Sequence, residues 1–331
     1  MMGEKQDPRG GGYAIRIAIA SLALAVLAGS AVGQPAPSPA PAQGGRGAQA
    51  RVLKYSLAPK PDPLTPWVAP NRPHWKLSEI QAAHARQLRW SQTVVRDAHF
   101  TGSFIQMAPG ERTKRLFYPD NEIFWVVQSG QMRVHIDGLE PFVAGKSVVV
   151  QVPARTPFHV ETVGDVPVLR FEVVHTGMLP IYAEAEKPDP APGHEYVRIA
   201  YAAPAAPPKL DPATVYIDFD KEIVQGGGRA GRFLKAGSFI RGMSIPTPPR
   251  DDLGHWHTET SEFYFIMEGK QDFQIEGQAP FIAEQGDVVY VPFGRYHRNN
   301  YTGGGMATRL AIFPAGNINN LDPDNPSRQA P

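Results

Sequence analysis

Two segments of the chain repeat one another at a fixed spacing, and this repeat limits the folds that the chain can adopt. Residues 136–144 read IDGLEPFVA, and residues 275–283, 139 positions later, read IEGQAPFIA. The same spacing superposes Gly130 on Gly269 and Pro153 on Pro292. A repeat of this kind predicts two copies of one structural unit in tandem.

Each copy is rich in short runs that are typical of β-strands. In the first copy, turn pairs such as Ser129-Gly130 and Asp137-Gly138 separate these runs. The runs fall at residues 104–107, 123–127, 132–136, 148–152 and 168–174. The pattern predicts an all-β protein with domains at residues 95–180 and 215–315, joined by a Pro/Ala-rich linker at residues 181–214.

The second copy contains a cluster of potential metal ligands. Residues i and i+2 of a strand face the same side, so His255 and His257 can direct two imidazoles at one point. A short polar loop brings Glu262 back beside them at the start of the next strand, and His297 supplies a fourth donor later in the chain. Three imidazoles and one carboxylate suit a borderline divalent metal such as Mn, Fe, Co, Ni or Zn.

These four donors lie in two motifs that resemble the paired motifs of the cupin superfamily. The first motif is His255, one residue, His257, four residues, Glu262, six residues, Gly269; the second is Gly286, five residues, Pro292, one residue, Gly294, two residues, His297. The resemblance implies that the four donors are metal ligands. It also implies two double-stranded β-helix (jelly-roll) barrels in tandem.

The repeat spacing predicts that the first copy has lost the ligands. The residues that precede the four donors by 139 positions are Leu116, Tyr118, Ile123 and Phe158. Glu122 and His159 each lie one position away from a ligand position, but a slip of one residue along a strand turns the side chain to the other face. We therefore expect a metal-free first barrel with an apolar interior at these points, serving packing, association or a lid.

Four further residues are candidates for contact with a substrate. Tyr264 shares a strand face with Glu262 and could donate a hydrogen bond as a catalytic residue. Glu259, in the loop between the ligands, could act as an acid or base, or be an ordinary solvated carboxylate. Arg241 and Arg309 flank the motifs and would pair with a substrate carboxylate if they face inward, which strand alternation alone does not decide.

Composition narrows the class of protein. The chain has 33 Lys and Arg against 32 Asp and Glu, so no basic surface for nucleic acid is visible, and it has no cysteine for disulfides, thiolate metal sites or a nucleophile. We expect one divalent transition metal per chain, Mn or Fe by preference, with Zn, Ni or Co as alternatives. A small-molecule substrate or ligand is the expected partner, and a homo-oligomer is an open alternative.

Three functions fit this sequence. The first is a metal-dependent enzyme of dioxygenase or decarboxylase type that acts on a small oxygenated organic acid or aromatic compound. The second is a non-catalytic periplasmic binding protein whose metal anchors a carboxylate ligand. In the third, the metal is structural and the barrels serve assembly, although purely structural metals are more often enclosed by four ligands.

The N-terminal residues predict export. A basic start, an apolar run at residues 17–28 and the small residues Ala31-Val32-Gly33 predict a signal peptide at residues 1–33 and a periplasmic or secreted protein. An uncleaved membrane anchor is the alternative, but the run is shorter than the roughly 20 residues of a span, so no stable anchor is expected after cleavage. We further predict a disordered linker at residues 34–50, an extended Pro-rich arm and short helix at residues 51–94, and a disordered tail at residues 316–331. A capping-box pattern at Ser78 predicts the start of that helix, which should run to about Leu88.

Overall fold

A computed structural model describes residues 57–200, 210–225, 240–245, 254–301, 307–314 and 319–321 of the chain. The predictions for residues 1–33 and 34–50 lie outside the described residues, as does most of the expected tail. In that tail, Asn320 exchanges two backbone hydrogen bonds with Trp256, at 2.9 and 3.1 Å. None of the helices among the described residues combines the length and the hydrophobicity that a membrane-spanning helix needs.

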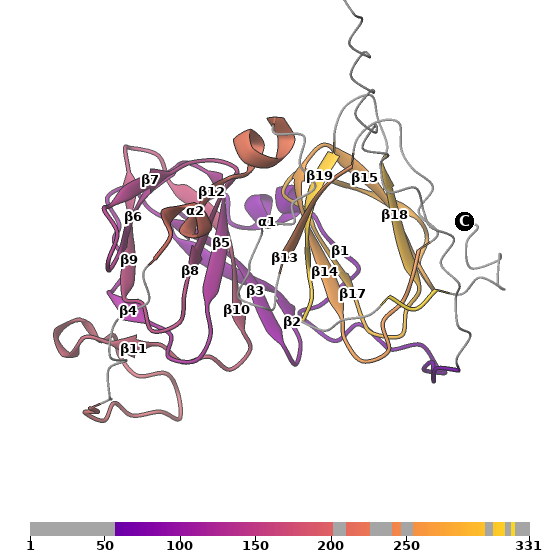
Figure 1. Cartoon of the computed structure of the whole chain (residues 1–331), viewed down its shortest axis with the longest axis horizontal. Coiled ribbons are helices and arrows are strands. Elements are labelled where there is room, and N and C mark those ends of the chain that lie inside the picture. Colours follow the sequence, from indigo (N-terminus) through magenta and orange to yellow (C-terminus); the bar gives the residue numbers. More distant parts are fainter. Residues whose placement is uncertain are drawn as a thin grey trace, which may run out of the picture. The chain divides into compact units, whose positions relative to one another are not determined.

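The first barrel is built from two sheets (Figure 1). One has the order β12-β8-β5-β10-β3-β2, with bounds Tyr216–Asp218, Val148–Val152, Ile123–Ser129, Val168–His175, Phe100–Met107 and Trp90–Arg96. The other has the order β11-β4-β9-β6-β7, with bounds Ile181–Tyr182, Leu116–Phe117, Phe158–Val163, Gln131–Ile136 and Phe142–Ala144. Apolar side chains from both sheets, such as Trp125, Val134 and Val150, form one core.

The second barrel is also built from two sheets, with fewer strands among the described residues. One sheet has the order β1-β17-β14-β19-β13, with bounds His74–Trp75, Val288–Val291, Glu262–Glu268, Ala307–Ile312 and Ile240–Ile245. The other has the order β16-β15-β18, with bounds Phe281–Glu284, Lys270–Ile275 and His297–Tyr301. The all-β prediction with two barrels is therefore confirmed.

The register of the strands reproduces the repeat residue by residue. In the first barrel Ile123 pairs with Val152, and in the second Glu262 pairs with Val291, both partners 139 positions later. Similarly, the pair Leu116–Phe158 corresponds to the bridge between His255 and His297. The spacing therefore identifies true structural equivalents, and a one-residue slip that would bring Glu122 or His159 to a ligand position does not occur.

Strand β14 is buried on both faces, and its alternation divides it between two cores. Tyr264 and Ile266 face the interior of the second barrel. Phe263 and Phe265 belong to a second core that also contains Phe104 and Phe171 of the first barrel. The rings of Phe171 and Phe265 stack with centroids 4.9 Å apart. Because one strand supplies both cores, the metal-ligand strand is fixed by packing on each side.

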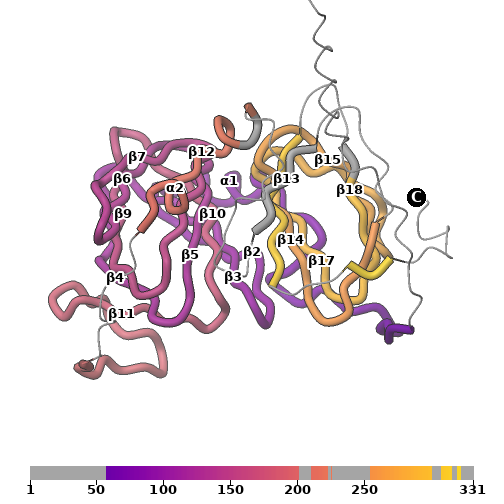
Figure 2. Tube along the Cα trace, viewed as in Figure 1, coloured from indigo at the N-terminus to yellow at the C-terminus, as the bar shows by residue number. Residues whose placement is uncertain are grey.

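Two short strands do not pair with the barrel that comes next after them in the chain. β1 precedes the first barrel but pairs with β17 of the second, and β12 precedes the second barrel but pairs with β8 of the first (Figure 1). In the tube of Figure 2, β12 lies beside strands of the first barrel such as β5 and β7. The pairs His74–Val289 and Tyr216–Val150 occupy equivalent positions, since Val150 and Val289 are 139 residues apart. The sequence did not predict these two crossings.

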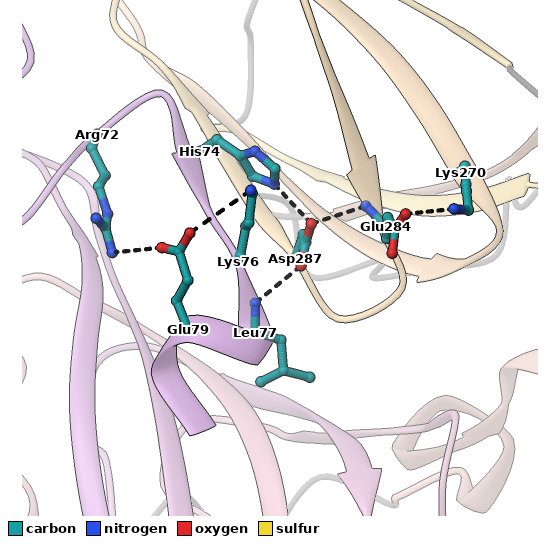
Figure 3. A network of polar contacts seen from close by, with 8 residues as sticks. All are labelled: Arg72, His74, Lys76, Leu77, Glu79, Lys270, Glu284 and Asp287. Carbon is teal, nitrogen blue, oxygen red and sulfur yellow. Dashed lines mark hydrogen bonds and ion pairs between the residues drawn. The ribbon is translucent and has the colours of Figure 1, made fainter. Parts of the chain in front are cut away.

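The arm that carries β1 is held by a carboxylate of the second barrel (Figure 3). Asp287 Oδ2 lies 2.7 Å from His74 Nε2 and accepts from the Glu284 backbone N–H at 2.9 Å, while its Oδ1 accepts from the Leu77 N–H at 3.0 Å. The first N–H of helix α1 (Leu77–Ala83) therefore donates to a residue far along the chain.

The predicted helix start and end were wrong. The residue before the helix, Lys76, makes no side-chain cap hydrogen bond, and Ser78 lies inside the helix. The carboxylate of Asp287 instead satisfies the N–H of Leu77, one of the first helix N–H groups that have no partner within the helix. The helix ends at Ala83, not near Leu88. The other helical segments are short: η1 (Glu184–Glu186), α2 (Pro212–Val215) and the π-helical η2 (Asp220–Gln225).

Candidate metal centre

The backbone around the candidate ligands is fixed by hydrogen bonds between separate segments. His255 and His297 exchange two backbone hydrogen bonds, of 2.9 and 2.8 Å, and the Gly294 N–H donates to the His257 carbonyl at 2.7 Å. Gly254 has a φ of +75°, and a Cβ there would lie 2.4 Å from the Tyr296 hydroxyl. Glycine is therefore required directly before His255, because the φ is positive and a Cβ would overlap Tyr296.

Four side chains converge on one point. The Nε2 atoms of His257, His297 and His255 lie 2.9, 3.1 and 3.5 Å from Glu262 Oε2. The ligand atoms of all four residues lie within 4.8 Å of one another. His257, Glu262 and His297 are buried, while His255 keeps 17% of its side chain exposed. The structure thus brings together the four residues that the sequence selected, with His255 as the most accessible of them.

The electrostatics favour the protonation states of metal ligands at Glu262 and His297. Burial raises the pKa of Glu262, but the polar contacts with the three imidazoles lower it by more than burial raises it. The pKa of Glu262 therefore lies well below the usual range. Burial lowers the pKa of His297, and Glu262 opposes this shift only in part. An anionic carboxylate next to a neutral imidazole is the state that metal binding requires.

The hydrogen bonding of His297 tests whether a metal fits. His297 Nδ1 lies 3.1 Å from the Arg295 carbonyl oxygen, which can only accept, so Nδ1 carries the proton of the neutral ring. Its Nε2 then directs a lone pair at Glu262 Oε2, 3.1 Å away. Two acceptors face one another there, and a cation between them would satisfy both.

The spacing of the donors agrees with this test. Ligand atoms about 2.1 Å from a metal, and at right angles about it, lie about 3 Å apart. The distances from Glu262 Oε2 to the three imidazoles, 2.9 to 3.5 Å, match this separation. The site therefore fits a divalent metal held by three imidazoles and one carboxylate.

Polar side chains line the barrel interior beside the donors. Tyr264 is buried, with its ring centroid 6.2 Å from that of His297. Arg309 is also buried, lies 5.4 Å above the Tyr264 ring and donates to Gln271 Oε1 at 3.2 Å. Arg309 therefore faces inward, which strand alternation alone had left open.

Two interior amides were not selected from the sequence. Gln271, on β15, is fully buried, and Asn299, on β18, is buried two residues after His297. Their amide nitrogens have no hydrogen-bond partner within the part of the chain that the structure describes. The alternation that placed Tyr264 beside Glu262 could have placed Asn299 beside His297 in the same way.

Of the two other candidate substrate residues, one is exposed and the side chain of the other lies outside the described structure. Glu259 lies in the loop between His257 and Glu262 with its side chain exposed, as expected of a solvated loop carboxylate. Arg241 lies on β13, where its backbone pairs with Ala311, but its side chain lies outside the described structure.

The N-terminal arm packs on the loop that carries the second motif. Arg295 stacks on Trp67 at 3.9 Å, and its Nε donates to the Thr65 carbonyl at 2.7 Å. A Cβ at Gly294 would lie 2.6 Å from Pro61. Arg295 thus holds the arm against the loop that leads to His297, and its role in this structure is positional.

The second barrel matches the model of a known domain family. Residues 246–313 match the family model of the cupin domain, and the first barrel repeats the strand pairing of this domain. The resemblance to two-barrel cupins is therefore confirmed. No curated protein matches the chain.

Solved structures with a similar fold include oxalate decarboxylase. One variant of oxalate decarboxylase from B. subtilis is 14% identical, with a TM-score of 0.47, over 70% of this chain and 75% of that chain. A cupin 2 conserved barrel domain protein from Leptotrichia buccalis is 12% identical, with a TM-score of 0.41, over 69% of this chain and 88% of that chain. Likenesses at this level give no information about the reaction.

Proposed function

We propose that the second barrel binds one divalent transition metal through His255, His257, Glu262 and His297. The observation that carries the proposal is the pair of facing acceptors, His297 Nε2 and Glu262 Oε2, 3.1 Å apart in a buried site. Mn or Fe is the metal we expect, with Zn, Ni or Co as alternatives, since all of them accept imidazole and carboxylate ligands.

Metal analysis of the purified protein tests this proposal. We expect one equivalent per chain, most of which is lost in His255→Ala and His297→Ala. His159→Ala and Glu122→Gln serve as matched controls, because they remove groups adjacent to the equivalent positions of the first barrel and should leave the metal content unchanged. Two equivalents per chain, with one lost in His159→Ala, would contradict the proposal.

The function we favour is a metal-dependent enzyme of dioxygenase or decarboxylase type. A metal with four protein ligands keeps one or two positions for a substrate or dioxygen, and it supplies Lewis-acid or redox chemistry there. Arg309 would bind the carboxylate of a small oxygenated organic acid, and Tyr264 would hydrogen-bond to the bound molecule. Arg241, across the strand pair from Ala311, stays a candidate for the same carboxylate.

A non-catalytic binding protein is the alternative, and the interior amides favour it. Gln271 and Asn299 can hydrogen-bond to a ligand but cannot transfer protons. Glu259, the candidate acid or base, is exposed. A screen for dioxygen uptake and carbon dioxide release, with organic acids and aromatic compounds as substrates, separates the two functions. Tight binding without turnover by fully metallated protein would favour the binding protein.

We also propose that the protein is exported to the periplasm or secreted. The basic start, the apolar run at residues 17–28 and the small residues before Gln34 support this. The mature chain should begin near Gln34. N-terminal sequencing of protein recovered outside the cytoplasm tests it, and an intact Met1 there would contradict cleavage.

A further inference from the structure

The first barrel keeps a cavity at the place where the second barrel gathers its donors. The cavity measures about 60 Å³. It is lined by all four residues at the equivalent positions: Leu116, Tyr118, Ile123 and Phe158. The substitution of the ligands has therefore left a space that is not filled by side chains.

A buried donor lines this cavity without an acceptor. Trp125, the equivalent of Tyr264, is 1% exposed, and its indole Nε1 has no hydrogen-bond partner among the residues that the structure describes. A buried N–H without a partner is destabilising, so native structures normally satisfy it with protein, water or a ligand. The cavity is the space beside Trp125 in which such an acceptor can lie.

The charges around the cavity are already balanced. Arg170, the equivalent of Arg309, is buried and donates from Nε to Glu172 at 2.9 Å and from Nη1 to Met107 Sδ at 2.9 Å. Both Arg170 and Glu172 line the cavity. An anion would be attracted by Arg170 but repelled by the carboxylate of Glu172. A neutral molecule would experience no net charge from this pair.

We propose that this cavity binds a small neutral polar molecule whose carbonyl or hydroxyl oxygen accepts the hydrogen bond of Trp125. A single water needs roughly 10–15 Å³ of such space, so the cavity has room for about four waters or an organic molecule of about four to six non-hydrogen atoms. The apolar part of the molecule would lie against Leu116, Ile123 and Phe158.

Acetamide and acetate are a matched pair of probes for this site, because they have nearly the same shape and differ in charge. The readout is the indole N–H signal of Trp125 in a ¹H–¹⁵N spectrum of the full chain, assigned by its absence in Trp125→Phe. Zn²⁺ is supplied as the metal because it is diamagnetic. We expect acetamide to shift this signal saturably, with half-saturation at a concentration at least threefold lower than that of acetate, and the other indole signals to stay in place.

Two variants control the assignment. Leu116→Phe should fill the cavity and abolish the shift, whereas Leu88→Phe, at an exposed position, should preserve it. The absence of a saturable shift in the wild type would show that the cavity holds water only, and tighter binding of acetate would show an anion site; either result overturns the proposal. A shift that persists in a folded Leu116→Phe variant would also overturn it. The readout lies in the first barrel and does not depend on whether the second binds a metal.

Discussion

The two barrels share the residue pairing of their central strands, yet they differ at the four donor positions. Where the second barrel has two histidines, a glutamate and a third histidine, the first has Leu116, Tyr118, Ile123 and Phe158. The arginine behind the site is common to both, as Arg309 and Arg170. The scaffold and the chemistry are thus separable, because the register is set by strand pairing and packing rather than by the ligands.

The largest effect is expected where the barrels share a core. Phe265→Ala removes a ring that stacks on Phe171 of the first barrel, and we expect a loss of about 3–5 kcal/mol in the free energy of unfolding. Urea unfolding, followed by signals from both barrels, measures it. Ile282→Ala, at an exposed position, is the control and should change stability by less than about 0.5 kcal/mol. If Phe265→Ala left the first barrel unaffected, the two barrels would be independent folding units.

The next effect concerns the charge of the metal centre. Glu262 is the only anionic donor of the four, so Glu262→Gln should weaken metal binding by about 10–100-fold and, if the protein is an enzyme, cut turnover further at saturating metal. Tyr264→Phe removes one hydroxyl beyond the ligands and should leave metal affinity unchanged while slowing turnover. Metal titration and turnover of fully metallated protein measure both. Wild-type turnover in both variants would place the chemistry elsewhere and favour the binding protein.

The third effect tests the different ways in which the barrels hold their crossing strands. Asp287→Asn replaces one of the two oxygens that bond to His74, Leu77 and Glu284 by an NH2 group that cannot accept, and it should cost about 1–3 kcal/mol. The equivalent residue of the first barrel is Val148, which pairs with Asp218 of β12 and has no side-chain acceptor. The control is Lys270→Ala, since Lys270 pairs with Glu284 at the surface and should contribute less than about 0.5 kcal/mol. A negligible loss in Asp287→Asn would mean that the arm is held by packing.

The sequence predicted the parts of this molecule that a long-range pattern encodes. The repeat placed the strands of both barrels, and the spacing of His255, His257, Glu262 and His297 selected side chains that do converge. Strands β1 and β12 were missed because two or three residues are too few to show an alternating pattern. The start of α1 was missed because its N–H is bonded by Asp287, more than two hundred positions away, and local capping patterns carry no such information.

The smallest effect comes from a pair of residues that differ between the barrels next to the ligand positions. In the first barrel Gln151 Nε2 donates to Glu122 Oε2 at 2.9 Å; at the equivalent positions of the second, the Tyr290 hydroxyl donates to Ser261 at 2.8 Å. Burial raises the pKa of Glu122 to about 7, and the hydrogen bond from Gln151 opposes this only in part. Of these two equivalent pairs, only the pair in the first barrel therefore contains a group that titrates near neutral pH.

The sign of its effect follows from proton binding. Between the ordinary pKa of a glutamate and about 7, the folded chain holds a proton on Glu122 that the unfolded chain has released. Stability from this group is therefore present at low pH, and it declines as the pH rises through this window. Glu122→Gln removes the titration, so the wild type should lose more stability than the variant between pH 5 and pH 8 in urea unfolding. Ser261→Ala, in the second barrel, should leave the pH dependence unchanged, and equal slopes for wild type and Glu122→Gln would show that Glu122 is ionised in the folded protein across this range.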